Sequence, residues 1–297
     1  MIRSWRGTFT AIVTPFKRDG SLDEAALRTL VDRQIEGGVD GIVPCGTTGE
    51  SVTMSTAERI RVIEIVREQS NDRVRVLAGA GGNSTAAVVT LAKQIDQVSV
   101  DGILIVVPYY NKPTQEGLYQ HFTTVADAVE APVVMYNVPG RTSANMTAET
   151  ALRLAEHGNI VGTKEASGAL TQVMEIIRGA PAGFSILSGE DNLAVPIIAL
   201  GGHGVVSVVS NEAPAMMSEM VRSALEGKMT EARELHYKLL GLMNVNFIET
   251  NPIPVKAALA MMGLIEEQYR LPLVPMAEAN REKLHLELMK LDLVAAP

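Results

Sequence analysis

Short apolar runs rich in β-branched residues alternate with amphipathic stretches along most of this 297-residue chain. We count eight such runs, and their starts are separated by about 20–34 residues. Near-continuous apolar runs are typical of strands that are covered on both faces, as in a parallel sheet. The runs lie at 8–13, 41–45, 75–80, 102–107, 132–137, 160–166, 184–189 and 204–209.

The segments between the runs have the pattern of helices. Residues 21–38 carry apolar side chains at helical spacing, with Ser21 as the expected N-cap, Glu24 as its capping-box partner and Gly37-Gly38 as the stop. Residues 55–69 and 147–158 repeat this design, each with Ser or Thr at the start and Glu in the first turn.

Strand–helix alternation repeated eight times predicts an α/β fold of the (β/α)₈ barrel type. A doubly wound open sheet is the alternative, but eight units are more than most open sheets use. Three further helices, at 229–249, 252–263 and 277–294, follow without another strand pattern. We therefore expect a barrel catalytic domain at 1–226 and a C-terminal helical domain at 227–297.

Composition excludes several classes of protein. A formal charge of −8 argues against sequence-independent nucleic-acid binding, which needs a basic face. The single cysteine, Cys45, excludes an internal disulfide framework and suits a reducing compartment. The N-terminal stretch "MIRSWRGTFT" shows no signal-peptide pattern, and no apolar run approaches a membrane span. We expect a cytoplasmic protein that binds neither nucleic acid nor membrane.

Polar residues follow five of the expected strands, and in a barrel such positions form the active site. The segments are "CGTTGES" (45–51), "PYYNKP" (108–113), "YNVPGRT" (136–142), "KEASG" (164–168) and "SGEDN" (188–192).

Lys164 stands at the end of the sixth run, where a lysine is rarely buried unless it is paired. An apolar pocket lowers the pKa of a lysine, and the neutral amine forms Schiff bases with carbonyl substrates. The alternative is a lysine paired with a carboxylate such as Glu165. Alternation along a strand places Lys164 and Glu165 on opposite faces, which weakens that alternative.

The turn around Thr47 and Thr48 is flanked by glycines and exposes backbone N–H groups that suit a carboxylate or phosphate. Alone this is a weak signal, and the ending of a P-loop is missing. The threonine hydroxyls are also candidates for proton relay.

Three of the six tyrosines, Tyr109, Tyr110 and Tyr136, fall at strand ends, although rim tyrosines with a wet hydroxyl are common. Arg141 is placed to bind a carboxylate bidentately; a solvated loop arginine is the alternative.

The sequence gives little support for a metal site or a cofactor site. The five histidines are scattered without a metal-binding spacing, and His203 reads as structural. Glu190 and Asp191 have the chemistry of Mg²⁺ ligands, yet a polar turn accounts for them more simply. No Rossmann glycine fingerprint follows the first strand, so we expect neither a cofactor nor a metal.

The motifs GTTGE, PYYN, YNVPGRT, KEASG, GGHGVVSV and NPIPVK follow one another in this order. The chain thereby resembles the dihydrodipicolinate synthase branch of the N-acetylneuraminate lyase superfamily over essentially its whole length. The resemblance implies a pyruvate-dependent barrel enzyme that condenses pyruvate with aspartate β-semialdehyde, in the biosynthesis of lysine and diaminopimelate. The product would be 4-hydroxy-tetrahydrodipicolinate.

The resemblance also implies roles for single residues. Lys164 would form the Schiff base, Tyr136 would shuttle protons above it, and Thr47 would link Tyr136 to Tyr110. Tyr110 would reach across a subunit interface, in a homotetramer built as a dimer of dimers.

Four further positions would bind substrate. Thr48 would hold the pyruvate carboxylate and Arg141 the carboxylate of the aldehyde. Gly189 and Val206 would line the pocket near the lysine, with valine at 206 in place of the more usual isoleucine.

Two other functions stay open at this point. A sister pyruvate aldolase or lyase would use the same lysine on a different aldehyde, although sister enzymes for long polyol chains typically lack "GRT" after the fifth strand. A non-catalytic barrel that binds a keto acid is the second alternative.

Feedback by lysine is expected to be weak or absent. The resemblance implies an allosteric pocket near the tight dimer interface, and Ser51, Asn83 and Tyr109 match it. Thr56 and Arg59 stand where histidines can occur, and Ala87 stands where a glutamate can.

Overall fold

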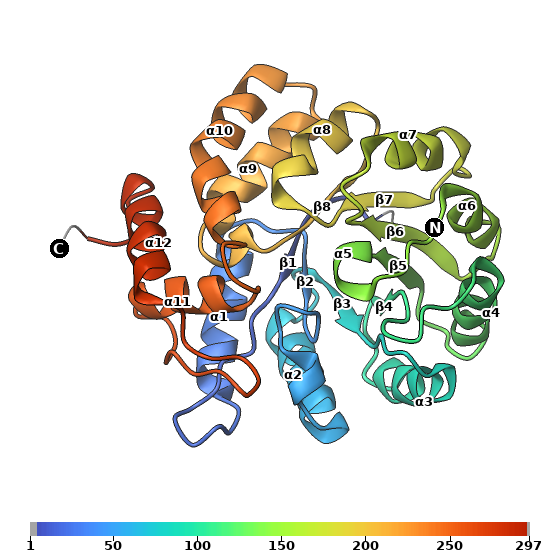
Figure 1. The fold of residues 1–297 in the computed structure, drawn as a ribbon, viewed down its shortest axis with the longest axis horizontal. Coiled ribbons are helices and arrows are strands. Elements are labelled where there is room, and N and C mark those ends of the chain that lie inside the picture. The colour runs from blue at the N-terminus through green and yellow to red at the C-terminus, as the bar shows by residue number, and fades with distance from the viewer. Residues whose placement is uncertain (1–4, 296–297) are drawn as a thin grey trace.

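The computed structural model describes residues 5–295 and forms a closed barrel of eight parallel strands in the order β1 to β8 (Figure 1). Each of the eight predicted runs coincides with one strand, although β1 begins one residue before its run, so the predicted barrel is confirmed and the open-sheet alternative is wrong. The strands are β1 (Gly7–Ala11), β2 (Gly41–Val43), β3 (Arg75–Gly79), β4 (Gly102–Val106), β5 (Val133–Asn137), β6 (Ile160–Glu165), β7 (Ser185–Ser188) and β8 (Gly204–Ser207).

Helices follow the strands and surround the barrel (Figure 1). They are α1 (Glu24–Glu36), α2 (Thr56–Ser70), α3 (Thr85–Asp96), α4 (Gln115–Ala126), α5 (Pro139–Thr142), α6 (Ala148–Ala155), α7 (Leu170–Gly179), α8 (Ala194–Ala199) and α9 (Pro214–Leu225). Short 3₁₀ turns lie at Ser51–Thr53, Asp191–Leu193 and Val209–Asn211.

The start of α1 corrects one sequence expectation. Asp23, not Ser21, caps the helix, because its carboxylate accepts a hydrogen bond from the N–H of Ala26. Ser21 is held further back, where its hydroxyl and N–H both donate to Asp19 in the turn that pairs Phe16 with Leu22. The glycine stop is confirmed, since α1 ends at Glu36 and Gly38 has a φ of +77°.

The other two predicted helix starts are confirmed. Ser55 caps α2 and forms a complete capping box with Glu58, and Thr147 caps α6 by accepting from Thr150. An N-cap side chain of this kind stabilises a helix by about 1 kcal/mol.

Two apolar layers hold the barrel together. A large cluster packs between the sheet and the surrounding helices, and a smaller one, which includes Leu104, Tyr136 and Val206, fills the barrel interior. The strands are apolar on both faces because each face meets one of these layers, which explains their near-continuous hydrophobic pattern.

Three helices follow the barrel, as predicted: α10 (Met229–Val245), α11 (Ile253–Met261) and α12 (Glu278–Lys290). They gather at one side of the barrel (Figure 1). A hydrophobic cluster joins α8 and α9 to α10 and α12, so apolar packing is continuous across residue 226, the predicted domain boundary. The division into two domains stays a prediction.

Residues 1–4, within the stretch predicted to hold no signal peptide, and residues 296–297, at the end of the predicted helical domain, lie outside the described residues. Among the helices of residues 5–295, none has the length and apolarity needed to cross a membrane.

Candidate active site

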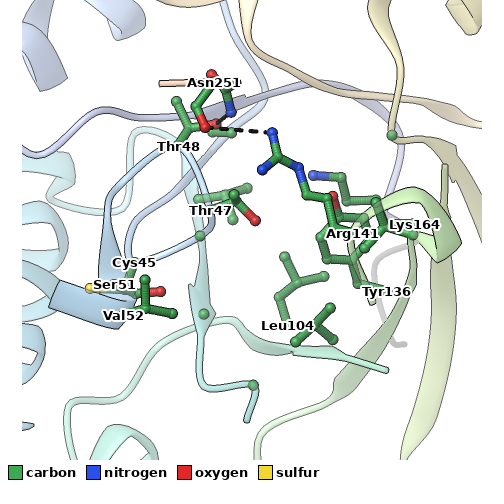
Figure 2. A pocket seen from close by; sticks show the side chains of 18 of the residues that line it. Cys45, Thr47, Thr48, Ser51, Val52, Leu104, Tyr136, Arg141, Lys164 and Asn251 are labelled. Carbon is green, nitrogen blue, oxygen red and sulfur yellow. Dashed lines mark hydrogen bonds between the residues drawn. The ribbon is translucent and has the colours of Figure 1, made fainter. Parts of the chain in front are cut away.

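A cavity of about 260 Å³ opens at the carboxyl ends of the barrel strands, where the sequence predicts the site. Strand ends and the loops that follow them supply its walls (Figure 2). The structure brings six of the eight predicted site residues to this cavity: Thr47, Thr48, Tyr136, Arg141, Lys164 and Gly189.

Lys164 lies on β6, level with Tyr136 on β5 and Leu187 on β7. Its side chain is only 7% exposed, and its Nζ lies 4.1 Å from the centroid of the Tyr136 ring. Burial lowers the pKa of Lys164 to about 7, the nearby Asp191 opposes this shift, and Arg141 adds to it. A large fraction of this lysine is therefore a neutral amine near pH 7, as an amine nucleophile must be.

The Glu165 carboxylate binds residues other than Lys164. Its carboxylate accepts hydrogen bonds from Asn137 Nδ2, at 3.1 Å, and from the N–H of Ser167, at 3.0 Å. Strand alternation thus separates Glu165 from Lys164, as the sequence indicates.

Asp191 supplies the negative charge that acts on Lys164. It is buried, and its Oδ2 accepts from the N–H groups of Val208 and Val209, each at 3.0 Å. These two bonds fix the carboxylate just beyond the end of β8. The sequence pattern indicates a polar turn or, less simply, a Mg²⁺ ligand at Asp191, and it does not predict the electrostatic effect of this residue on the lysine.

Tyr136 is buried beside Lys164, and the side chain of Thr47 is near enough to act on the pKa of its hydroxyl. Burial raises the pKa of Tyr136 to about 12, although the Arg141 charge and the Thr47 side chain both oppose the shift. Its hydroxyl is therefore protonated at neutral pH and is able to donate a proton or a hydrogen bond.

The turn that carries Thr47 and Thr48 is tightly built. The N–H of Glu50 donates to the carbonyl of Thr47 at 3.0 Å, and Cys45 and Glu50 both have left-handed backbones at its two ends. Gly79 of β3 lies so close that a Cβ there would come within 2.2 Å of the Cys45 carbonyl oxygen. The turn is thus fixed by the adjacent strand.

Thr48 is buried, and its hydroxyl accepts a hydrogen bond from Asn251 Nδ2 at 3.0 Å. Asn251 lies just before α11, and its carbonyl accepts from Arg141 at 3.5 Å (Figure 2). Asn251 opens the "NPIPVK" motif, but the motif alone predicts no role for this residue. The sequence shows only an asparagine next to a proline, outside any barrel strand. This pattern does not predict a hydrogen bond to a residue 203 positions away.

Arg141 comes from the short helix α5 and lines the mouth of the cavity. Figure 2 shows it beside Lys164 and Tyr136, with Thr47 and Thr48 across the cavity. Its charge lowers the pKa of both Lys164 and Tyr136, so it acts on the site although its side chain is exposed.

Two predicted site residues do not line the cavity. Tyr110 is 89% exposed and has a φ of +74°, while its neighbour Tyr109 lines the cavity instead. Val206 is buried in the barrel interior with Tyr136 and Leu187, and Val208 is the β8-side residue in the wall. The roles of Tyr110 and Val206 stay predictions.

Two side chains in the segments that the resemblance assigns to an allosteric lysine pocket donate hydrogen bonds to backbone carbonyls of this chain. Arg59 donates from Nε to the carbonyl of Ser51 at 2.7 Å, and Asn83 donates to the carbonyl of Tyr109 at 3.2 Å. Ala87, in α3, brings no carboxylate to this region.

Within residues 5–295, no group of three or more histidine, cysteine, aspartate or glutamate side chains is arranged to hold a metal ion. Glu190 and Asp191, the pair considered as Mg²⁺ ligands from the sequence, do not form such a group.

A closed parallel barrel with a buried, partly neutral lysine at the carboxyl ends of its strands is typical of enzymes that form Schiff bases with carbonyl substrates. The model of the dihydrodipicolinate synthetase family matches residues 4–291. The chain belongs to this family.

Individual relatives are similar over nearly their whole length. The 4-hydroxy-tetrahydrodipicolinate synthase of Koribacter versatilis is 56% identical over 280 residues, which are 94% of this chain and 93% of the relative. The crystal structure of dihydrodipicolinate synthase from Aquifex aeolicus has a TM-score of 0.96 at 45% identity and covers 99% of this chain and 100% of its own. A monomeric dihydrodipicolinate synthase variant has a TM-score of 0.95 at 44% identity, with 97% of each chain covered.

Proposed function

We propose that this chain condenses pyruvate with aspartate β-semialdehyde to give 4-hydroxy-tetrahydrodipicolinate, a step of lysine and diaminopimelate biosynthesis. The observation that carries the proposal is Lys164, a buried lysine whose pKa is lowered to about 7. Membership of the dihydrodipicolinate synthetase family favours this function over that of a sister aldolase or lyase.

Pyruvate binds with its ketone at Lys164 and its carboxylate at the turn of Thr47 and Thr48. The neutral amine attacks the ketone carbon, and water leaves as the imine forms. Loss of a proton from the methyl group then gives an enamine, which is a carbon nucleophile.

The aldehyde is held by its own carboxylate at Arg141, whose guanidinium lines the cavity mouth. The enamine carbon attacks the aldehyde carbon, and the resulting alkoxide takes up a proton. The amine of the bound substrate then attacks the imine carbon and displaces the Lys164 amine, which closes the ring and frees the enzyme.

Tyr136 moves protons at these steps. It is protonated at neutral pH, it lies over the lysine, and the nearby Thr47 connects the buried site to an exposed side chain. General acid–base catalysis of this kind contributes roughly 10²–10⁴-fold to rate.

Tyr110 completes the relay from a neighbouring subunit. Its 89% exposure in a single chain suits a side chain that is buried only when a second copy of the chain docks on it. A homotetramer, built as a dimer of dimers and located in the cytoplasm, is the assembly we expect. Sedimentation of the wild type and of Tyr110→Ala tests the assembly, because a monomeric wild type with full activity would contradict it.

Trapping tests the proposed chemistry. Pyruvate followed by borohydride should add one reduced pyruvate to Lys164, as mass spectrometry of the peptide will show. Absence of an adduct on a folded protein would mean that the Schiff-base mechanism is wrong and would favour a barrel that only binds a keto acid.

A coupled assay tests the substrate. Pyruvate with aspartate semialdehyde should turn over, whereas sialic acid and 2-keto-3-deoxy-gluconate should not. Arg141→Ala should raise the KM for the semialdehyde far more than that for pyruvate, and unchanged values of both constants would refute the assignment of this aldehyde.

A further inference from the structure

A fully buried ion pair joins the C-terminal helices to the turn that carries Thr47 and Thr48. Lys256 of α11 donates from Nζ to Oε1 of Glu50 at 2.5 Å, and both side chains are 0% exposed. Aromatic rings enclose the lysine, with the Phe16 centroid at 4.5 Å and the Tyr269 centroid at 5.3 Å from Nζ.

Such a pair is a poor source of stability. The desolvation of two buried charges offsets most of their attraction, and apolar replacements of similar volume are often neutral or stabilising. The burial of Lys256 lowers its pKa, and Glu50 acts in the opposite direction. We therefore interpret the pair as a contact that positions the backbone around Glu50.

Glu50 is bound from more than one side. Its Oε2 accepts from the N–H of Arg270 at 3.3 Å, so two residues of the C-terminal part hold one carboxylate. Its own backbone is left-handed, with a φ of +51°, and its N–H closes the turn onto the Thr47 carbonyl. A non-glycine residue holds that conformation only where its surroundings enforce it.

The same C-terminal segment reaches the turn at a second point, where Asn251 donates to the Thr48 hydroxyl. Residues 251 and 256 thus contact residues 48 and 50, one pair at the cavity wall and one pair behind it. The two contacts fix both the position and the orientation of the turn.

We propose that Glu50 and Lys256 are positioning residues, whose buried pair holds the turn of Thr47 and Thr48 in the geometry that binds the carboxylate of pyruvate. This inference rests on the proposed function, because it assigns pyruvate to the cavity. Neither residue lines the cavity, so both act through the turn.

The double variant Glu50→Gln/Lys256→Met tests the inference, since it removes both charges and leaves no buried ion unpaired. We expect a folded protein whose melting temperature is close to that of the wild type. Its KM for pyruvate should rise about tenfold or more, because small misplacements of binding groups are costly in rate and affinity. The adduct trapped by borohydride should need correspondingly more pyruvate.

Arg281→Met is the matched control. Arg281 pairs with Glu267 in the same C-terminal part, at 2.6 Å, and neither residue contributes to the turn. We expect an unchanged pyruvate KM in this variant. If the role of Lys256 were only structural, both variants would change the melting temperature and neither would change the KM.

The outcomes separate the two proposals. A folded double variant with wild-type pyruvate KM and kcat overturns the positioning role while the wild type still forms its adduct. A wild type without an adduct overturns the proposed function and this inference with it. If the double variant does not fold, Lys256→Met decides, since it removes the ammonium group that donates to Glu50; an unchanged pyruvate KM there also overturns the inference.

Discussion

Gly189 leaves the space that the side chain of Lys164 occupies. A Cβ at position 189 would lie 3.1 Å from Cε and 3.2 Å from Cγ of Lys164, and 2.7 Å from the Cβ of Ala166. The reach of the lysine into the cavity therefore depends on a missing side chain on the neighbouring loop.

Gly189→Ala should consequently impair Lys164 more than it impairs the fold. The Ala166 methyl is not at the end of a flexible chain, so the backbone or the lysine must shift. We expect kcat/KM for pyruvate to fall about 10²-fold, with a loss of unfolding free energy of about 1–3 kcal/mol. Trapping kinetics and urea unfolding measure the two effects, and wild-type trapping kinetics would contradict the prediction.

Lys164→Met should abolish the adduct and stabilise the protein. Below pH 7 the folded chain carries a buried ammonium whose pKa has been lowered from 10.5 to about 7. The unfolded chain binds that proton more tightly, so the penalty is full below about pH 7 and disappears as the pH rises toward 10.5.

Methionine removes this penalty. We expect the variant to exceed the wild type in unfolding free energy by about 2–4 kcal/mol at pH 6, and by less at pH 9. Urea unfolding at both pH values measures the difference. A variant less stable than the wild type at pH 6 would show that burial of the Lys164 ammonium does not lower the free energy of unfolding.

Asp191→Asn should move the pH dependence of adduct formation to lower pH. The rate should rise with pH through about 7 in the wild type, as Lys164 loses its proton. The Asp191 charge raises the pKa of Lys164, so its removal should lower that pKa further. Asparagine keeps an oxygen that accepts from Val208 or Val209.

Glu190→Gln is the control for that shift. Glu190 is half-buried and adjacent in sequence, but it acts on Tyr136 and not on Lys164. Its pH profile for adduct formation should match that of the wild type. A shift of the Asp191→Asn profile to higher pH would contradict the assigned sign.

Tyr136→Phe should slow turnover about 10²-fold or more, because it removes the proton-carrying hydroxyl and keeps the ring that packs on Lys164. Thr47→Val should have a smaller effect, since it removes only the neighbouring hydroxyl that acts on Tyr136. Single-turnover measurements with pyruvate distinguish imine formation from later steps. Equal rates for Tyr136→Phe and the wild type would exclude the relay.

Lysine should inhibit the enzyme weakly or not at all. Ala87 offers no carboxylate for the α-amino group of lysine, and Arg59 binds the carbonyl of Ser51. A titration of lysine in the coupled assay measures this, with Ala87→Glu as the variant expected to gain sensitivity. Potent inhibition of the wild type by sub-millimolar lysine would disprove the prediction.

The strands could be predicted from the sequence because each is apolar on both faces and lies between two core layers. Helix starts were less certain, as the first helix illustrates. Both Ser21 and Asp23 are good caps, and the choice of Asp23 depends on a turn between Phe16 and Leu22 that local pattern does not reveal.

The strand-end residues of the site could be predicted for the same reason, since a barrel gathers its strand ends at one face. Three features of the site could not be predicted from the sequence: the roles of Asn251 and Lys256, and the effect of Asp191 on Lys164. Their partners lie on other elements, at separations of about 200 residues for Thr48 with Asn251 and Glu50 with Lys256, and no periodicity encodes such contacts.

The contacts of Thr48 with Asn251 and of Glu50 with Lys256 also set an order of events during synthesis. All eight strands have been made once residue 207 has been translated, but the groups that contact Thr48 and Glu50 come from residues 251–256. A nascent or truncated chain that ends between these points holds Lys164, Tyr136 and Arg141 but lacks the groups that fasten Thr48. The turn of Thr47 and Thr48 is therefore the last part of the cavity to be fastened, after every barrel strand and the buried lysine have been made.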